Sequence, residues 1–232
     1  MEQKQVGLIL LLAGRGSRLF EAIHKKKQFY PIKGKELFLY TLENLLKAPF
    51  FTHLVLVIDQ EEEERVREDL KKIVLPSSLS LSFTYGGNDR NESVHHGLEA
   101  LKEKLTRKDS VVFIHDSARV LVRESVLEEL YQESFTYDAL TTAIPVHDSL
   151  LKEKDGRIEY VDRKDLYQIQ TPQVFNYHKI LSLYESGYDP SDTDDFKKAV
   201  RASYSCHLVR GDIRTFKITE KDDLEMLEAI LS

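Results

Sequence analysis

Hydrophobic residues along the chain follow two alternating patterns. Short apolar, β-branched runs predict buried strands at 6–13, 53–59, 81–85, 110–115 and 139–145. Segments with the period of a helix lie between them, and they predict amphipathic helices at 37–46, 61–74, 93–105 and 123–133. This alternation predicts an α/β fold with an open, mainly parallel, twisted sheet and helices on both faces. Because ligands bind beyond the carboxyl ends of such strands, we expect the site just after Ala13, near Gly86 and just after His115.

The rhythm changes between about residues 146 and 174. Lys154-Asp155-Gly156 is a turn signal between two short strand candidates, 149–153 and 157–161. We therefore expect a single domain over 1–232 with a protruding β-arm. A two-stranded arm is only marginally stable alone, so we expect it to pack against a second subunit. A final helix is predicted at 220–231, opened by a near capping box of Thr219 and Asp222.

The composition is that of a globular protein, with 41% hydrophobic and 31% charged residues in a chain of 232. A net charge of −6 argues against nucleic-acid binding, which usually requires a strongly basic face. The single cysteine, Cys206, excludes an internal disulfide framework and fits a reducing compartment. The apolar run at 6–13 is too short to span a membrane. We expect a cytoplasmic protein with neither a nucleic-acid nor a membrane partner.

The positive charge is concentrated near the N-terminus. From Arg15 to Lys35 the net charge is +6, so the remainder carries −12, which points to a small polyanion as ligand. Gly14 and Gly16 follow the first predicted strand and allow a phosphate to approach the backbone. Alone this motif is more often an ordinary turn, since the third glycine of a dinucleotide fingerprint is absent.

Two cations near the glycine turn change that interpretation. Arg18 and Lys27 suit a triphosphate whose charge is neutralised during group transfer. Lys25 and Lys26 are expected to face solvent. Asp116 directly follows the predicted strand 110–115, where it is either a ligand for magnesium that bridges phosphates or a turn cap. His115 is expected to be packed in the strand, and the eight histidines show no zinc spacing.

Nine motifs occur along the chain in the order of one family. They are Ala13-Gly14-Arg15-Gly16-Ser17-Arg18, Lys27-Gln28-Phe29, Gly86-Gly87-Asn88-x-Arg90-x-x-Ser93-Val94, His115-Asp116-Ser117-Ala118-Arg119, Asp148-Ser149, Val161-Asp162-Arg163, Gln170-Thr171-Pro172-Gln173, Thr193-Asp194-Asp195 and Lys217-Ile218-Thr219. From about Leu8 onward the chain resembles the 2-C-methyl-D-erythritol 4-phosphate cytidylyltransferases of the non-mevalonate isoprenoid pathway. The resemblance implies a Rossmann-like nucleotidyltransferase fold and a homodimer joined through β-arms. It also implies a reaction of CTP with methylerythritol phosphate, a small polyol phosphate, giving the CDP-linked alcohol and pyrophosphate.

The same resemblance implies the roles of individual residues. The residues that stabilise charge during transfer would be Arg18, Lys27 and Lys217. The nucleotide would be bound by Ala13, Gly14, Gly16, Gly87, Asn88, Ser93 and Ser117. The second substrate would be held by Arg119, Ser149, Arg163, Thr171, Thr193 and Thr219, with Ser149 and Arg163 supplied by the neighbouring subunit. Asp116 would contact Mg²⁺.

Some residues depart from the family pattern. Lys26 stands where the family usually has proline, which predicts a less rigid loop. Asn88 replaces an aspartate near the ribose, and Val120 replaces a proline. The proposed charge-stabilising cations and the metal ligand are all retained.

Two alternatives accompany this interpretation. The first is the similar ribitol 5-phosphate cytidylyltransferase family, against which Val161-Asp162-Arg163 and Thr193-Asp194-Asp195 argue. The second is a non-catalytic nucleotide-binding protein of the same fold. A scaffold would not need three cations and an acid in one cleft, so the enzymatic interpretation is preferred.

Overall fold

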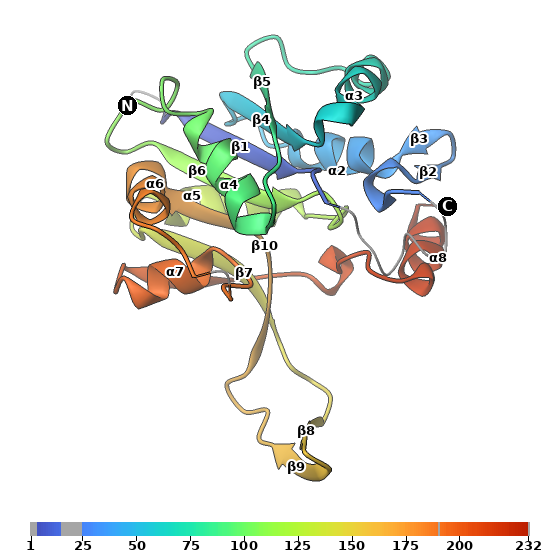
Figure 1. Ribbon diagram of the computed structural model, residues 1–232, viewed down its shortest axis with the longest axis vertical. Helices are drawn as coiled ribbons and strands as arrows, with labels where there is room; N and C mark the ends of the chain where they lie inside the picture. The colour runs from blue at the N-terminus through green and yellow to red at the C-terminus, as the bar shows by residue number, and fades with distance from the viewer. Residues whose placement is uncertain (1–3, 15–24, 190, 232) are drawn as a thin grey trace.

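Seven strands form one sheet in the computed structural model, which describes residues 4–14, 25–189 and 191–231. Their order is β11-β7-β10-β6-β1-β4-β5 (Figure 1). Their bounds are β1 Val6–Leu11, β4 His53–Ile58, β5 Ser80–Tyr85, β6 Val111–Asp116, β7 Ala139–Pro145, β10 Tyr167–Asn176 and β11 Cys206–Arg210. Only the pairings of β10 with β6 and β7 are antiparallel, whereas the other neighbours in this sheet pair in parallel. The predicted mainly parallel sheet is confirmed.

Strand β1 lies at the centre because it is apolar on both faces. Every residue from Val6 to Leu11 is buried. Leu8 and Leu10 belong to the core cluster on one face of the sheet, and Ile9 and Leu11 to the cluster on the other. Continuous apolar strands of this kind are typical of parallel sheets covered by helices on both sides.

The helices divide between the two faces, as predicted. Packed on one face are α2 (Leu37–Leu45), α3 (Glu63–Leu70) and α5 (Glu124–Glu133). Packed on the other are α4 (Arg90–Glu99), α6 (Tyr177–Glu185) and α7 (Phe196–Arg201). The C-terminal helix α8 (Lys221–Ile230) packs on a third, smaller cluster with Ile32, Ala118 and Ile218. Short elements complete the fold: η1 Lys27–Phe29, η2 Gln60–Glu62, η3 Ile213–Thr215, β2 Pro31–Ile32 and β3 Lys35–Glu36.

Some helix boundaries differ from the predictions. Helix α4 begins before residue 93, because the Asp89 side chain accepts a hydrogen bond from the backbone N–H of Glu92 and caps it. The predicted helix 61–74 is split into η2 and α3. The capping box of α8 is made by Glu220 and Asp223, one residue later than the predicted pair. Elements β10, α6, α7 and β11 were not predicted; α7 has only six residues, too few for a helical period to be recognised.

The predicted arm projects from the body of the molecule (Figure 1). Strands β8 (Leu150–Lys154) and β9 (Arg157–Val161) pair antiparallel at its tip and form a sheet of their own. Asp155 and Gly156 both have positive φ, as a two-residue hairpin turn requires. Leu151 lies opposite Tyr160, and together with Ile158 they form an exposed apolar surface, with Tyr160 82% exposed.

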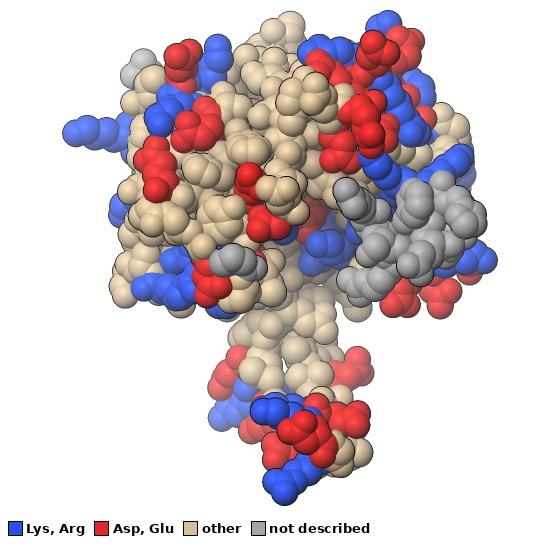
Figure 2. Space-filling view, viewed as in Figure 1, with Lys and Arg blue, Asp and Glu red and all other residues tan. Residues whose placement is uncertain are grey.

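Charged residues of both signs are mixed over the face shown in Figure 2, on the body and on the arm. Within the described ranges, the longest helices have ten residues, and none combines the length and hydropathy needed to cross a membrane.

Candidate active site

One pocket opens beyond the carboxyl ends of β1 and β6, where the sequence placed the site. It is lined from the β1 turn, η1, the start of α4, the end of β6 and the segment before α8. The residues of this pocket that the sequence had singled out are Ala13, Gly14, Lys27, Ser93, Asp116, Ser117 and Lys217. The fold therefore assembles side chains that are up to two hundred residues apart in sequence.

The backbone after β1 is fixed by its neighbours. The N–H groups of Leu12 and Ala13 both donate to the Val57 carbonyl, at 2.8 and 2.7 Å. The buried Gln28 amide donates to the carbonyls of Leu12 (2.6 Å) and Gly14 (3.2 Å). A Cβ at Gly86 would lie 2.2 Å from the Cβ of Ala13, so only glycine permits this approach. The backbone of residues 12–14 is thus held in a defined conformation.

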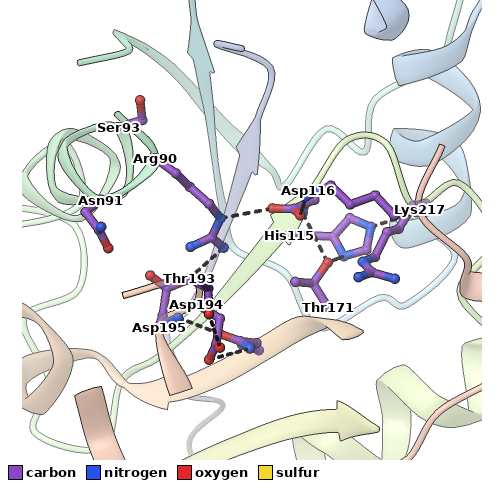
Figure 3. A network of polar contacts seen from close by, with 12 residues as sticks. Arg90, Asn91, Ser93, His115, Asp116, Thr171, Thr193, Asp194, Asp195 and Lys217 are labelled. Atoms are coloured by element: carbon purple, nitrogen blue, oxygen red, sulfur yellow. Dashed lines mark hydrogen bonds and ion pairs between the residues drawn. The ribbon is translucent and has the colours of Figure 1, made fainter. Parts of the chain in front are cut away.

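Asp116 is the buried carboxylate of the pocket, and two cations hold it (Figure 3). Its Oδ2 accepts from Lys217 Nζ at 2.6 Å, and its Oδ1 lies 3.3 Å from Arg90 Nε. Burial alone would raise the pKa of Asp116, but the charges of Arg90 and Lys217 outweigh it and hold that pKa far below the ordinary value. Asp116 is therefore ionised.

Arg90 is a site residue to which the sequence gave no role. It reaches from α4 between Asp116 and Asp195, with Nη2 2.9 Å from Asp195 Oδ2 (Figure 3). Asp195 is fully buried and also accepts from the Tyr184 hydroxyl. Burial alone would lower the pKa of Arg90, but Asp195 and Asp116 raise it above its ordinary value. The structure places Arg90 in the first turn of α4, where a cation opposes the helix dipole and needs acidic partners, but the predicted helix began only at residue 93 and gave no such signal.

His115 connects several residues of the site through hydrogen bonds. Burial lowers its pKa to about 4, so the imidazole is neutral. Its Nε2 lies 2.8 Å from the Arg119 carbonyl and must donate, which leaves Nδ1 to accept from the Thr171 hydroxyl at 3.0 Å. The Thr171 oxygen in turn accepts from the Asp116 N–H at 3.2 Å. This chain of hydrogen bonds fixes the backbone that carries Asp116, and the prediction that His115 is packed in the strand agrees with its burial.

A second pocket adjoins the first and shares Arg90, Asp116 and Lys217 with it. Three further residues that the sequence had singled out line this second pocket: Arg119, Thr171 and Thr193. The Arg119 guanidinium donates to the Thr215 carbonyl at 2.9 Å, and burial lowers its pKa. Two ligands could therefore meet at the shared residues.

Other predicted site residues lie outside both pockets. The Gly87 N–H donates to the Ser93 hydroxyl at 3.0 Å, so Gly87 borders the first pocket. Asn88 is turned toward Glu92. The Thr219 hydroxyl donates to the Lys217 carbonyl at 2.9 Å. Ser149 and Arg163 belong to the arm, and Gly16 and Arg18 lie outside the described residues.

One prediction about the basic segment was wrong. Lys26 does not face solvent: its side chain is only 18% exposed, and its ammonium group pairs with Asp59, Glu61 and Glu62. Lys25 is exposed, as predicted. The periodicity of the basic run gave no indication that three carboxylates from another part of the chain would meet Lys26.

The donor set suits a magnesium ion that enters with phosphates. In the described part of the chain, no three His, Cys, Asp or Glu side chains are grouped to hold a metal. Magnesium commonly uses one or two carboxylates together with substrate phosphates and water. The ionised Asp116 supplies one such carboxylate at the junction of the two pockets.

Comparisons with known proteins identify the family of the chain. Residues 6–232 match the family model of 2-C-methyl-D-erythritol 4-phosphate cytidylyltransferase. The chain is 34% identical to the enzyme of that name from Thermotoga neapolitana, over 96% of this chain and 95% of the relative. It is 33% identical to that from Geobacillus kaustophilus, over 97% and 96%.

A solved structure has the same fold. The 4-diphosphocytidyl-2C-methyl-D-erythritol synthase of Anaerococcus prevotii superposes with a TM-score of 0.82 at 24% identity, covering 98% of this chain and 96% of its own. The family model and the relatives extend over the sheet, both pockets and the arm. The chain therefore belongs to the 2-C-methyl-D-erythritol 4-phosphate cytidylyltransferase family and is a nucleotidyltransferase enzyme.

Proposed function

We propose that this chain transfers the cytidylyl group of CTP to 2-C-methyl-D-erythritol 4-phosphate, giving 4-diphosphocytidyl-2-C-methyl-D-erythritol and pyrophosphate. The observation that carries this proposal is the junction of the two pockets at Arg90, Asp116 and Lys217. The nucleotide occupies the first pocket and the alcohol phosphate the second. The phosphate of one substrate can then attack the α-phosphorus of the other at the shared residues.

The chemistry requires charge stabilisation more than proton transfer. The attacking phosphate is already an anion near neutral pH, so no general base is needed. Two anions must be brought together, and charge grows on the leaving pyrophosphate. Lys27 and Lys217 supply positive charge from opposite ends of the chain. Arg18 is the third cation of this proposal, outside the described residues.

The nucleotide is bound mainly by backbone. Ala13, Gly14 and Gly16 line the phosphates, while Gly87 and Ser93 hold the cytidine with the help of Asn88 and Ser117. The Ser93 hydroxyl accepts from Gly87 and donates to the Asp89 carbonyl at 2.8 Å, so it also shapes the loop that would surround the base.

Asp116 would hold Mg²⁺ together with the nucleotide phosphates. When bound, the ion neutralises phosphate charge and orients the triphosphate. Lys217 keeps the Asp116 carboxylate oriented toward the pocket junction.

Arg119, Thr171, Thr193 and Thr219 hold the second substrate. Ser149 and Arg163 complete its site from the arm of a partner subunit in a homodimer. Support for the dimer comes from the apolar tip of the arm, where Leu151, Ile158 and Tyr160 are all exposed in this chain. A partner would cover that surface, which a two-stranded sheet needs for stability. With one cysteine and no disulfide, the chain fits the cytoplasm.

The test measures pyrophosphate release by the full chain with CTP and Mg²⁺. We expect turnover with methylerythritol phosphate to exceed turnover with ribitol 5-phosphate at equal concentrations. Equal or greater turnover with ribitol phosphate would overturn the substrate assignment. Absence of turnover with both would favour the non-catalytic alternative. Lys72 follows α3 and forms salt bridges with Glu36 and Asp69. Lys72→Met therefore serves as the matched surface control and should keep wild-type rates.

A further inference from the structure

Lys26 joins two parts of the chain through a cluster of charges. Its Nζ lies 2.8 Å from Asp59 Oδ2, 2.8 Å from Glu61 Oε1 and 3.0 Å from Glu62 Oε1. Asp59 directly follows β4, and the two glutamates lie in η2. Figure 2 shows basic and acidic side chains gathered at the α3 end of this face. We call Lys26, Asp59, Glu61 and Glu62 the charge clasp.

The clasp differs from an ordinary surface ion pair. Isolated exposed pairs contribute little, because solvent screens them and two long side chains must be ordered. Here one ammonium group with little exposure meets three carboxylates. Burial alone would lower the pKa of Lys26, but the hydrogen bonds to Asp59, Glu61 and Glu62 outweigh burial and raise it. Lys26 therefore stays charged at any pH at which the enzyme would work.

The element that follows Lys26 connects two parts of the site and the hydrophobic core. Lys27 donates to the Ile218 carbonyl at 2.8 Å, beside Lys217. Gln28 holds the Leu12–Gly14 turn, as described above. Phe29 is buried against the edge of Phe38. Each of these contacts is made by one of the three consecutive residues of η1.

Element η1 has little stability of its own. It is a single 3₁₀ turn, and its N-cap residue, Lys26, makes no side-chain capping bond. Turns of this kind have poor hydrogen-bond geometry. The position of η1 must therefore come from its side chains, and among the described residues the clasp is a contact that holds its N-terminal end.

We propose that Lys26 is a positioning residue for the nucleotide half of the reaction. The clasp holds the start of η1 against the end of β4, and it thereby holds Lys27 and the Gly14 turn where the triphosphate binds. The first pocket is lined by Lys27 and Gln28 of η1, whereas the second-substrate pocket contains no η1 residue. We therefore expect the clasp to affect the binding of CTP more than that of the second substrate. This inference rests on the proposed function.

The charge of Lys26 acts in the same direction. Asp59 follows Ile58, whose carbonyl accepts a hydrogen bond from the Gly86 N–H at 2.9 Å. Gly86 lies close to Ala13 of the first pocket. The first of the three carboxylates is therefore one residue away from backbone that contacts this pocket.

Without the ammonium group of Lys26, Asp59, Glu61 and Glu62 would lose their shared positive partner, and Glu62 would keep its contact with Arg65 at 3.7 Å. The added negative charge on this side of the site would repel CTP. Loss of positioning and loss of neutralisation both weaken the use of CTP.

The test compares Lys26→Met, Lys26→Arg and Lys72→Met with the wild type in steady-state pyrophosphate assays. Lys72 is the matched control, because it also bridges carboxylates but contacts neither η1 nor a pocket. We expect Lys26→Met to lower kcat/KM for CTP about tenfold and to change KM for methylerythritol phosphate less than twofold. Lys26→Arg should restore most of the loss, and Lys72→Met should behave as wild type.

The outcomes separate the inference from the function on which it rests. Unchanged CTP kinetics in Lys26→Met, with an active wild type, would overturn the positioning role and leave the function standing. If Lys26→Met impaired the use of CTP and of methylerythritol phosphate equally, and Lys72→Met did the same, the effect would be a general structural one. That result would also overturn the positioning role. An inactive wild type would instead contradict the proposed function.

Discussion

The pocket and the arm differ in which kind of side chain is buried and which is exposed. In the pocket, charged groups are buried and paired: Asp116 lies between Lys217 and Arg90, and Arg90 continues to the fully buried Asp195. On the arm, apolar groups are exposed, and Leu151, Ile158 and Tyr160 face solvent in the single chain. The pocket is built within one chain, whereas the arm has a surface that one chain leaves uncovered. The difference separates side chains that are paired within the chain from side chains that the single chain leaves exposed.

Loss of a pocket cation should have the largest effect. Lys217→Ala removes a charge that lines both pockets, and we expect turnover to fall about 10²- to 10³-fold. Lys27→Ala should behave similarly. Pyrophosphate release measures the effect, and circular dichroism checks that the fold is intact. Wild-type rates in both variants would show that these lysines do not stabilise the transferred charge.

Mixed dimers test whether the arm completes a neighbouring pocket. Arg163→Ala and Lys217→Ala should each be nearly inactive alone. After co-refolding, half of the dimers carry one site with both residues intact, so about a quarter of wild-type activity should return. Activity that stays at the low level of the separate variants would place Arg163 in its own chain's site. Wild-type activity of Arg163→Ala alone would place Arg163 outside the reaction.

Acid should destabilise the pocket through His115. Its pKa lies near 4 in the folded chain, below its ordinary value of 6.5. The unfolded chain therefore binds the proton first, and stability that is present above pH 6.5 is lost as pH falls toward 4. The difference corresponds to about 3 kcal/mol.

Urea unfolding at pH 7, 6, 5 and 4 measures this loss. The matched variant His115→Gln retains an amide that can donate to the Arg119 carbonyl, but it cannot titrate. Its stability should fall less steeply over the same range. Identical slopes for the two proteins would exclude His115 as the source.

The smallest effect on stability is expected at the arm tip. Ile158→Thr and Tyr160→Thr change exposed side chains, so the free energy of unfolding of the body should shift by less than about 0.5 kcal/mol. Sedimentation should nevertheless show weaker self-association. If the variants sediment as the wild type does, the apolar tip is not the dimer contact.

The central strand, the location of the pocket and the tip of the arm were predictable from the pattern of residue types along the chain. The run from Val6 to Leu11 is apolar on both faces, which requires a strand covered on two sides, and the rule for parallel sheets then located the pocket. Asp155-Gly156 marked the tip of the arm because few other residues adopt positive φ readily. The order of nine motifs indicated the family.

Other features arise only from contacts between distant segments. Arg90 belongs to one of the nine family motifs, yet its position in the site depends on Asp195, more than a hundred residues away. Lys26 belonged to a basic run, and such runs are usually hydrated. Only the fold brings the end of β4 and η2 beside it.

The sequence alone determined the order of the main strands and helices from β1 to β9, the final helix, the edge of the sheet that holds the site, and the family. These depend on local periodicity and on residue types at fixed spacing, which the chain displays directly. The tertiary structure decided which charges are paired: Asp116 with Lys217 and Arg90, and Lys26 with three carboxylates. Charge pairing depends on distances of a few ångströms and on exclusion of water, and neither quantity exists until the segments have packed.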